Sequence, residues 1–318
     1  MEIVVGLPAA ATVDEVHQLV VAGATEFFVG YLPQYWSHKF GQEFSPNRRY
    51  FAGAQVDSIE RLRTLCEAAA EHQVPVAVAF NEHFVTPDAM ELGRRLLDEA
   101  VAAGCSAIIV ADPSLVPYFN KHIPAVNIHV SGDAGLYNRH ACEAVFQAGA
   151  RRVIFPRELP LTELTPLLSA TIGPGREFEA FVMGEPCVFD GARCFTEHGY
   201  GFACDFCNHH ERKHLRRRSG HSRRPLDPPQ AALLDNPRNR AVWGLGKCGL
   251  CAVGRLAHLG VTHIKIPGRA SDALPAIRLV KQLLDTPHRS KASAQQLLDA
   301  PELCASRTFC YFPEVHDD

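Results

Sequence analysis

Eight short segments of apolar and β-branched residues recur along the chain, and most precede a stretch in which apolar residues have helical spacing. This alternation is typical of parallel βαβ units. We expect strands at residues 2–7, 26–30, 75–80, 107–110, 126–130, 152–155, 178–182 and 262–266, and helices at residues 13–22, 58–71, 87–103, 141–148 and 161–169. Eight such units predict an α/β fold, a TIM-like (β/α)8 barrel. A doubly wound open sheet is the alternative, but no GxGxxG motif follows the first strand.

Composition places the chain among ordinary globular proteins. It has 318 residues, 47% of them hydrophobic and 21% charged, which is enough apolar material for a full core. The net charge of −3 argues against binding nucleic acid over the whole surface. No segment approaches the apolar length of a membrane span, and the N-terminus is strand-like. We therefore expect a soluble, cytoplasmic protein, in which clustered cysteines act as ligands and not as disulfides.

The long segment 184–252 follows the seventh expected strand and far exceeds the usual length of a βα loop. In a (β/α)8 barrel such loops lie at the carboxyl ends of the strands, where active sites form, so we interpret it as a functional insertion. The early loop 31–54, which is rich in aromatic and basic residues, could cover the same face. The predicted organisation is a barrel over residues 1–286, including the insertion, followed by a tail over 287–318.

Cysteines concentrate in this insertion, where six of the chain's eleven occur: Cys187, Cys194, Cys204, Cys207, Cys248 and Cys251. Gathered thiolates bind zinc or an iron–sulfur cluster. Two CxxC pairs would suit zinc, but 40 residues separate them, against a usual 15–20, and Cys187 and Cys194 would be unused. A 4Fe–4S cluster tolerates wider spacing and could take Cys187, Cys194 and one cysteine of each pair. The spacing leaves both metals open.

Around these cysteines the chain resembles the collagenase-like peptidases, peptidase family U32. The resemblance covers about residues 1–275, and its central motif is carried by Glu179, Phe181, Gly184, Cys187 and Cys194, with Cys248 seventeen residues before Lys265. Collinear, weaker matches include Asn81, Asp112, His129 and Arg157. Pro267 departs from the family pattern, which has a glutamate there. The resemblance implies a 4Fe–4S cluster held by Cys187, Cys194, Cys204 and Cys248, with Cys207 as the alternative to Cys204.

Several members of that family are oxygen-independent hydroxylases that take the oxygen from prephenate. The resemblance therefore implies hydroxylation of an aromatic or quinone-precursor small molecule, as in ubiquinone biosynthesis, with a second family member as heterodimer partner. The alternatives are an RNA-base hydroxylase that uses the basic loop 212–224, a peptidase, and a non-catalytic zinc- or cluster-binding scaffold. The peptidase alternative lacks support, because the sequence has no nucleophile elbow and no HExxH motif.

The candidate site residues follow expected strand ends. Candidate catalytic residues are Asn81, Asp112, His129 and Arg157, and candidate substrate-binding residues are Arg193 and Arg269. Arginine suits a dicarboxylate such as prephenate, because its guanidinium binds carboxylates in a bidentate fork. The competing structural interpretations are ion pairs at strand ends for the arginines and a barrel-interior position for His129. For Glu179 we favour a structural pairing with Lys265.

Overall fold

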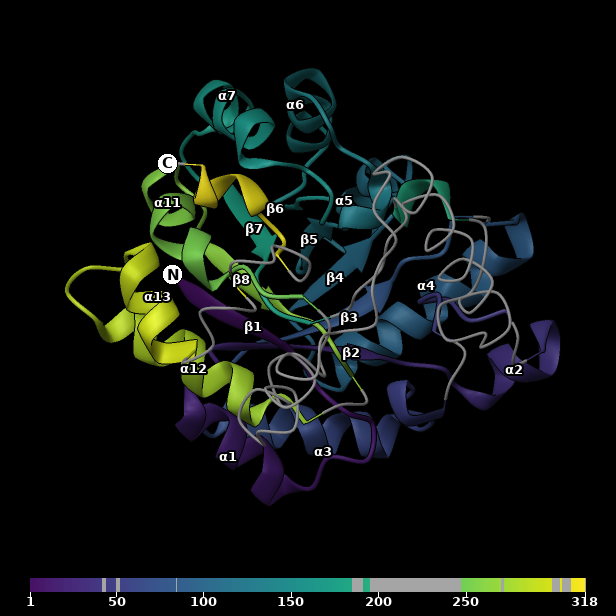
Figure 1. Ribbon diagram of the computed structural model, residues 1–318. Coiled ribbons are helices and arrows are strands. Elements are labelled where there is room, and N and C mark those ends of the chain that lie inside the picture. Colours follow the sequence, from purple (N-terminus) through teal and green to yellow (C-terminus); the bar gives the residue numbers. More distant parts are fainter. Residues whose placement is uncertain are drawn as a thin grey trace, which may run out of the picture.

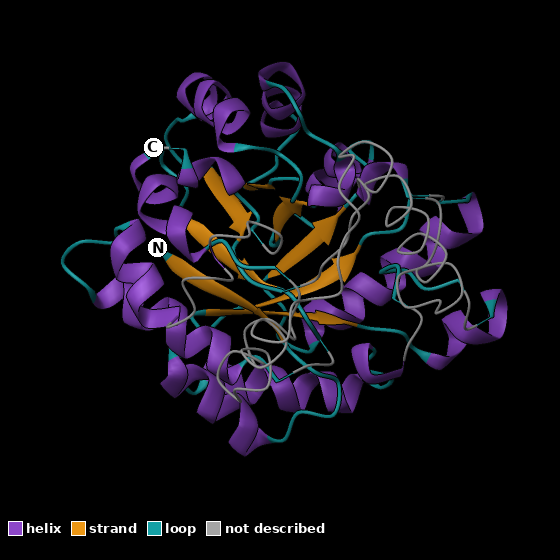
Figure 2. Ribbon diagram, viewed as in Figure 1, coloured by secondary structure: helices purple, strands orange, loops and turns teal. Residues whose placement is uncertain are grey.

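The computed structural model describes residues 1–41, 44–49, 52–83, 85–184, 191–194, 247–269, 272–298, 304 and 310–317. Its centre is a closed barrel of eight parallel strands surrounded by helices (Figures 1 and 2). The strands are β1 (Glu2–Gly6), β2 (Glu26–Gly30), β3 (Val76–Phe80), β4 (Ala107–Val110), β5 (Asn127–Val130), β6 (Arg152–Ile154), β7 (Glu177–Phe181) and β8 (His263–Ile266). Each pairs with the next along the chain, and β8 pairs with β1. The closure confirms the predicted barrel and excludes the open sheet.

The outer layer consists of helices that follow the strands in order. Their bounds are α1 (Val13–Ala22), α2 (Gln34–Phe40), α3 (Ile59–Ala70), α4 (Pro87–Ala102), α5 (Leu115–His122), α6 (Arg139–Gln147), α7 (Leu161–Thr171), α11 (Val253–His258), α12 (Leu274–Asp285) and α13 (Lys291–Leu298). Short 3-10 helices are η1 (Ala52–Ala54), η2 (Gly132–Ala134), η3 (Gly191–Arg193), η4 (Leu250–Ala252) and η5 (Pro313–His316). Among the described helices, none is long and apolar enough to cross a membrane.

Side-chain caps fix where several of these helices begin. Thr12 forms a capping box with Glu15 at the start of α1, and Ser58, Thr86 and Asn138 cap α3, α4 and α6. Each cap satisfies a backbone N–H that has no partner within its helix. The five helices expected from the sequence are confirmed to within two residues at each end. No bounds were predicted for α2, α5, α11, α12 and α13, although eight βα units imply further helices.

A buried ion network crosses the interior of the barrel. Arg152 of β6 is 3% exposed and lies among three carboxylates. Its guanidinium donates to both carboxylate oxygens of Glu26 at 2.8 Å, to Glu179 at 2.9 Å and to Glu177 at 3.0 Å. Lys265 of β8 donates to the other oxygen of Glu179 at 2.7 Å, which confirms the predicted pairing. Charges buried this deeply are tolerated only when they are paired and hydrogen-bonded.

The network shifts the titration of its members in opposite directions. Burial alone would raise the pKa of Glu179, but the Lys265 and Arg152 cations outweigh it and hold this pKa at about 2. For Glu26 burial dominates over Arg152 and raises the pKa. Burial and the nearby Arg152 lower the pKa of His263 to about 4, so this imidazole is neutral near pH 7.

Residues 287–318 pack on the barrel where the structure describes them. Helix α13 contacts α12 and η4, and its Leu298 is buried. The last 3-10 helix, η5, lies beside α7 and α11 (Figure 1), and the Glu314 carboxylate accepts a hydrogen bond of 2.5 Å from the Leu161 backbone N–H at the start of α7. The C-terminal segment is thus attached to the outer layer through α13, which packs on α12, and through η5, which contacts the start of α7.

We predict that Arg152→Met lowers the free energy of unfolding by about 3–5 kcal/mol, because it leaves Glu26 and Glu179 buried without their cation. Chemical denaturation monitored by circular dichroism measures this change. The neighbouring Arg151→Met is the matched control: Arg151 is 46% exposed and pairs with Glu177 at the surface, so its loss should cost only about 0–1 kcal/mol. Equal effects of the two substitutions would contradict a stabilising role for the interior network.

The same network predicts how stability depends on pH. His263 has a folded-state pKa of about 4, below its ordinary value of 6.5, so the unfolded chain binds a proton first as the pH falls through this window. Glu179, with a pKa of about 2, contributes stability that is complete above pH 4.5 and is lost on acidification toward pH 2. The unfolding free energy should therefore fall continuously from about pH 6.5 downward. His263→Gln should reduce the loss between pH 6.5 and 4, leaving the share of His129, whose pKa is also lowered, and keeping the more acidic part.

Candidate functional site

A cavity lies at the carboxyl ends of the strands, where (β/α)8 enzymes have their active sites. Its lining residues come from most of the barrel: Phe28, Arg49, Ala79, Asn81, Ile109, Ser131, Asp133, Ile154, Arg157, Phe181, Lys265, Pro267 and Arg269. We call this the mouth cavity. Its polar side chains face a floor of apolar residues from the strands. This composition is typical of a ligand site, in which a few placed polar groups give orientation and apolar walls exclude water.

The mouth cavity is rich in cationic side chains. The Arg157 guanidinium lies 4.6 Å from the centroid of the Phe181 ring, and Lys265 Nζ lies 3.9 Å from that of Phe28. Arg269, which is 4% exposed, donates to Asn47 Oδ1 at 3.1 Å. Stacking and hydrogen bonding hold these long side chains in place, which reduces the entropy lost when they bind a ligand. The cavity is therefore suited to carboxylate or phosphate groups.

Asn81 adds a neutral polar group to this cavity. It directly follows β3, and its Oδ1 atom is buried without a hydrogen-bond partner among the described residues. A buried acceptor without a partner costs free energy that a ligand donor would recover. An amide side chain can pair with the N–H or carbonyl edge of a ring, because it carries both a donor and an acceptor. Asn81 is thus fitted to orient a planar polar ligand.

Arg48 connects the mouth to the first part of the insertion. It is 2% exposed and donates to the carbonyl oxygens of Gly191, at 3.0 Å, and Cys194. Its Nη1 also lies 3.6 Å from Asp133 Oδ2 and 2.8 Å from His83 Nε2. Burial and the neighbouring Arg48 cation lower the pKa of His83. A Cβ at position 191 would collide with Asp133, so only glycine allows η3 this close approach.

The structure brings three of the six candidate catalytic and substrate-binding residues together. Asn81, Arg157 and Arg269 all line the mouth cavity. His129 belongs to the ion network: it is 3% exposed, its Nδ1 lies 3.9 Å from Glu26, and burial holds its pKa well below the ordinary value. Asp112 is absent from the described cavity lining and caps the turn before α5, where it accepts from the Ser114 N–H at 2.8 Å.

The expected cluster ligands are only partly within the described residues. Cys194 follows η3 and is half-buried, and Cys248 is buried beside β7. The other expected ligands, Cys187, Cys204 and Cys207, lie outside the described residues. The Arg193 side chain and the basic loop 212–224 lie outside them as well. The ligand set therefore stays a prediction.

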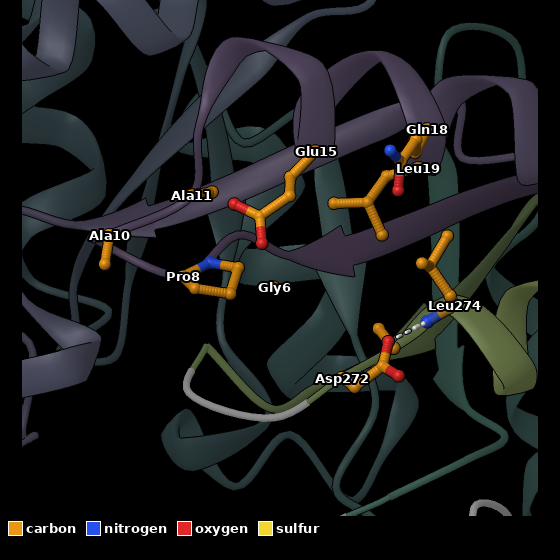
Figure 3. A pocket seen from close by; sticks show the side chains of 10 residues that line it. Gly6, Pro8, Ala10, Ala11, Glu15, Gln18, Leu19, Asp272 and Leu274 are labelled. Carbon is orange, nitrogen blue, oxygen red and sulfur yellow. Dashed lines mark hydrogen bonds between the residues drawn. The ribbon is translucent and has the colours of Figure 1, made fainter.

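A larger groove on the outer side of the mouth has different chemistry (Figure 3). It is lined by the end of β1, by α1 and by the start of α12, and has a volume of about 460 Å³. Its two carboxylates already serve helix ends: Glu15 accepts from the Thr12 N–H at 2.6 Å, and Asp272 accepts from the Leu274 N–H at 3.0 Å. Because these groups are engaged in capping, the smaller mouth cavity is the better candidate for an active site.

Comparison with known proteins agrees with this architecture. A family model for peptidase family U32 matches residues 11–312. The chain belongs to peptidase family U32. The solved structure of the U32 peptidase Mk0906 is 12% identical and superposes with a TM-score of 0.50, covering 84% of this chain and 93% of that one. At this identity the likeness supports the barrel fold alone.

Two curated relatives are tRNA hydroxylation proteins. Protein P of Escherichia coli (strain K12) is 35% identical over 106 residues, which are 33% of this chain and 23% of the relative. Protein P1 of Bacillus subtilis (strain 168) is 26% identical over 190 residues, which are 59% of this chain and 40% of the relative. The matches thus span less than half the length of either relative.

Within this U32 barrel, the early loop brings to the mouth a polar group that was not predicted from the sequence. Asn47 donates to Gln55 Oε1 at 2.8 Å, Gln55 donates to Ser45 Oγ at 2.8 Å, and Arg48 lies beside them. The only signal was the basic and aromatic character of loop 31–54. That composition indicated which face the loop covers, but it could not identify which side chains point inward.

We predict that Arg48→Met lowers the unfolding free energy by about 1–3 kcal/mol, because the Gly191 and Cys194 carbonyls and Asp133 lose a buried donor. Thermal and chemical denaturation measure the loss. The control is Arg63→Met on the exposed face of α3, where the change should stay within about 0.5 kcal/mol. A stability equal to that of the unsubstituted chain would show that the Arg48 contacts with η3 are energetically neutral.

Proposed function

We propose that this chain catalyses an oxygen-independent hydroxylation of a planar ring at the mouth cavity, with prephenate as the oxygen donor. The observation that carries the proposal is the set of side chains there: three arginines, a lysine, and an asparagine whose buried Oδ1 has no partner within the described chain. Cationic groups suit the two carboxylates of prephenate, and the amide suits the polar edge of a ring. Membership of family U32 and the names of the two relatives support the same reaction class.

A transfer RNA base is the first candidate for the ring. Both relatives described above are named for tRNA hydroxylation. The basic segment 212–224 would supply the cations that phosphate contacts require, which is the dominant attraction in RNA binding. A quinone precursor, presented alone or by a second family member, is the alternative ring. Both candidates present a planar ring, but the base is a nitrogen heterocycle on a phosphate backbone, whereas the quinone precursor is a benzenoid ring without one.

The cofactor in this proposal is a 4Fe–4S cluster. Thiolates are its usual ligands, and Cys187, Cys194, Cys204 and Cys248, with Cys207 as the alternative to Cys204, would hold it. The described part fits, because Arg48 binds the Cys194 carbonyl while Asp133, beside Arg48, lines the mouth cavity. Cys194 therefore lies next to the cavity and not on the outer wall. The cluster would supply redox chemistry, which the side chains of the mouth lack.

The residues of the mouth would bind and orient the two substrates. Arg157 and Arg269 would pair with the carboxylates of the oxygen donor, since a guanidinium fork fits a carboxylate and stays charged. Asn81 would fix the ring that is hydroxylated through its amide. Phe28 and Phe181 would exclude water from one side of the cavity, which strengthens each of these polar contacts.

The test is an anaerobic incubation of cluster-loaded protein with prephenate and either unmodified tRNA or a quinone precursor, followed by mass spectrometry of the products. We expect a hydroxylated base in the tRNA arm. Arg157→Met should lower kcat/KM for prephenate by about 10- to 100-fold, because a charge-assisted hydrogen bond is lost, while the exposed Arg139→Met should leave it unchanged. Hydroxylation of the quinone precursor alone would show that the tRNA base is not the substrate and that the quinone precursor is.

Cluster content is measured on the same preparations by iron and sulfide analysis and by the visible spectrum. Cys187→Ala should lose iron, sulfide and hydroxylation together. Active protein without iron or sulfide would contradict the cofactor. Peptide cleavage without hydroxylation in either arm would overturn the proposed reaction and favour the activity in the family's name.

A further inference from the structure

Four cysteine side chains line one small cavity at the side of the barrel mouth. They are Cys248, Cys251, Cys304 and Cys310, and the other lining residues are apolar or glycine: Gly249, Ala252, Leu298, Phe312 and Val315. The first two cysteines form a CxxC pair at the end of the long insertion, and the other two come from the C-terminal segment. None of the four forms a disulfide. Cys304 and Cys310 took no part in the sequence-based interpretation.

The backbone brings these segments together at the root of the insertion. Cys248 forms an antiparallel bridge with Met183, just after β7, and a parallel bridge with Cys310. The Gly184 N–H donates to the Lys247 carbonyl at 3.0 Å, and the Tyr311 N–H donates to the Cys248 carbonyl at 2.9 Å. The segment before the insertion, the segment after it and the C-terminal segment thus pair side by side, each supplying or flanking a thiol.

The four sulfurs make hydrogen bonds of the kind that metal ligands make. The Leu250 backbone N–H donates to the Cys248 sulfur, but burial outweighs this contact and raises the pKa of Cys248 to about 12, so a bound metal would have to displace the proton. Cys251 donates to the sulfur of Cys304. Cys310 Sγ lies 3.3 Å from His316 Nε2, so this imidazole can donate to a thiolate. A buried cysteine used only as a small apolar side chain needs none of these contacts.

We propose that Cys248, Cys251, Cys304 and Cys310 bind one Zn²⁺ ion, with His316 as a hydrogen-bond donor to Cys310. Zinc prefers four tetrahedral ligands, and four thiolates are a common structural set. The cavity between the four residues is small, with a volume of about 10 Å³, and leaves room for a single ion. Among the described residues, no three of these sulfurs lie within 4.8 Å of one another, so the four side chains would have to close around the ion. Rotation about each Cα–Cβ bond would bring them to a common ion.

The site would act as a structural crosslink. A closed four-thiolate zinc site has no open position for a substrate, and its binding energy contributes to folding. Here the ion would join the end of the insertion to the C-terminal segment, directly beside β7. Each bound thiol would release its proton, so zinc affinity would rise with pH.

This inference takes Cys248 from the proposed cluster and so divides the cysteines into two sets. Cys248 would serve zinc, and the cluster would then take Cys187, Cys194, Cys204 and Cys207, all of which precede it in the insertion. The family resemblance implies that Cys248 is a ligand of the iron–sulfur cluster, whereas here it would bind zinc. A zinc measurement and a cluster measurement on one protein therefore test the two proposals separately.

The experiment is metal analysis of the full chain purified anaerobically, with zinc, iron and sulfide measured together. We expect about one zinc per chain in addition to any iron. Cys251→Ser, Cys304→Ser and Cys310→Ser should each lose the zinc and keep the iron, the sulfide and the visible spectrum. The matched control is Cys142→Ala, a buried cysteine on α6 that lines no part of this cavity, which should keep the zinc.

A second measurement does not depend on the folding of the variants. Cobalt added to chelator-treated protein should give the thiolate-to-cobalt charge-transfer absorption of a four-sulfur site, and zinc should displace it. His316→Asn should keep the site but weaken zinc binding by about 10- to 100-fold, as loss of an outer hydrogen bond to a ligand does. Absence of zinc from the unsubstituted protein, its retention in Cys304→Ser and Cys310→Ser, or iron and sulfide lost with these two residues would each overturn the zinc assignment.

Discussion

The guanidinium of Arg152 is the interaction on which the interior of this barrel depends. It ties together the register of four strands, because Arg152 belongs to β6 and its partners come from β2, β7 and β8. A slip of one residue in any of these strands would turn a carboxylate outward and leave the cation buried alone. Apolar packing tolerates small errors, whereas an unpaired buried charge costs several kcal/mol. We infer that the network selects the register that also places Lys265, Arg157 and Arg269 at the mouth.

Much of the fold was predictable, because strand alternation is a local signal. Buried parallel strands appear as short apolar segments, and all eight were placed within about two residues of their observed ends. The pairing of Glu179 with Lys265 was also predictable, since both follow a pattern of inward positions. The helices α2 and α5 were not located because they are short, and α13 because the helical pattern weakens beyond about residue 284. Their packing on the barrel, and not their intrinsic propensity, stabilises them.

The residues of the candidate site that were predicted are those with a local sequence signal, and those that were not predicted depend on contacts between distant parts of the chain. Asn81, Arg157 and Arg269 were identified because strand ends can be located from the sequence, and in a barrel those ends converge. Arg48 could not be identified, since its role depends on a loop turning back over the mouth to meet Gly191, far along the chain. Cys304 and Cys310 were missed for the same reason: only the bridge between Cys310 and Cys248 reveals that the C-terminal segment returns to the insertion.

The root of the insertion shows how a barrel can carry a long segment at its mouth. The insertion leaves the barrel at Gly184 and returns at Lys247, and a backbone hydrogen bond joins these two positions. Closing the ends of a long loop costs chain entropy, and that cost grows only slowly with length once the ends are held together. Holding the ends at β7, with Arg48 as a second attachment at Gly191 and Cys194, therefore lets the segment between them change in length and composition. Substrate preference can then vary within the family while the interior ion network and the strand ends stay in place.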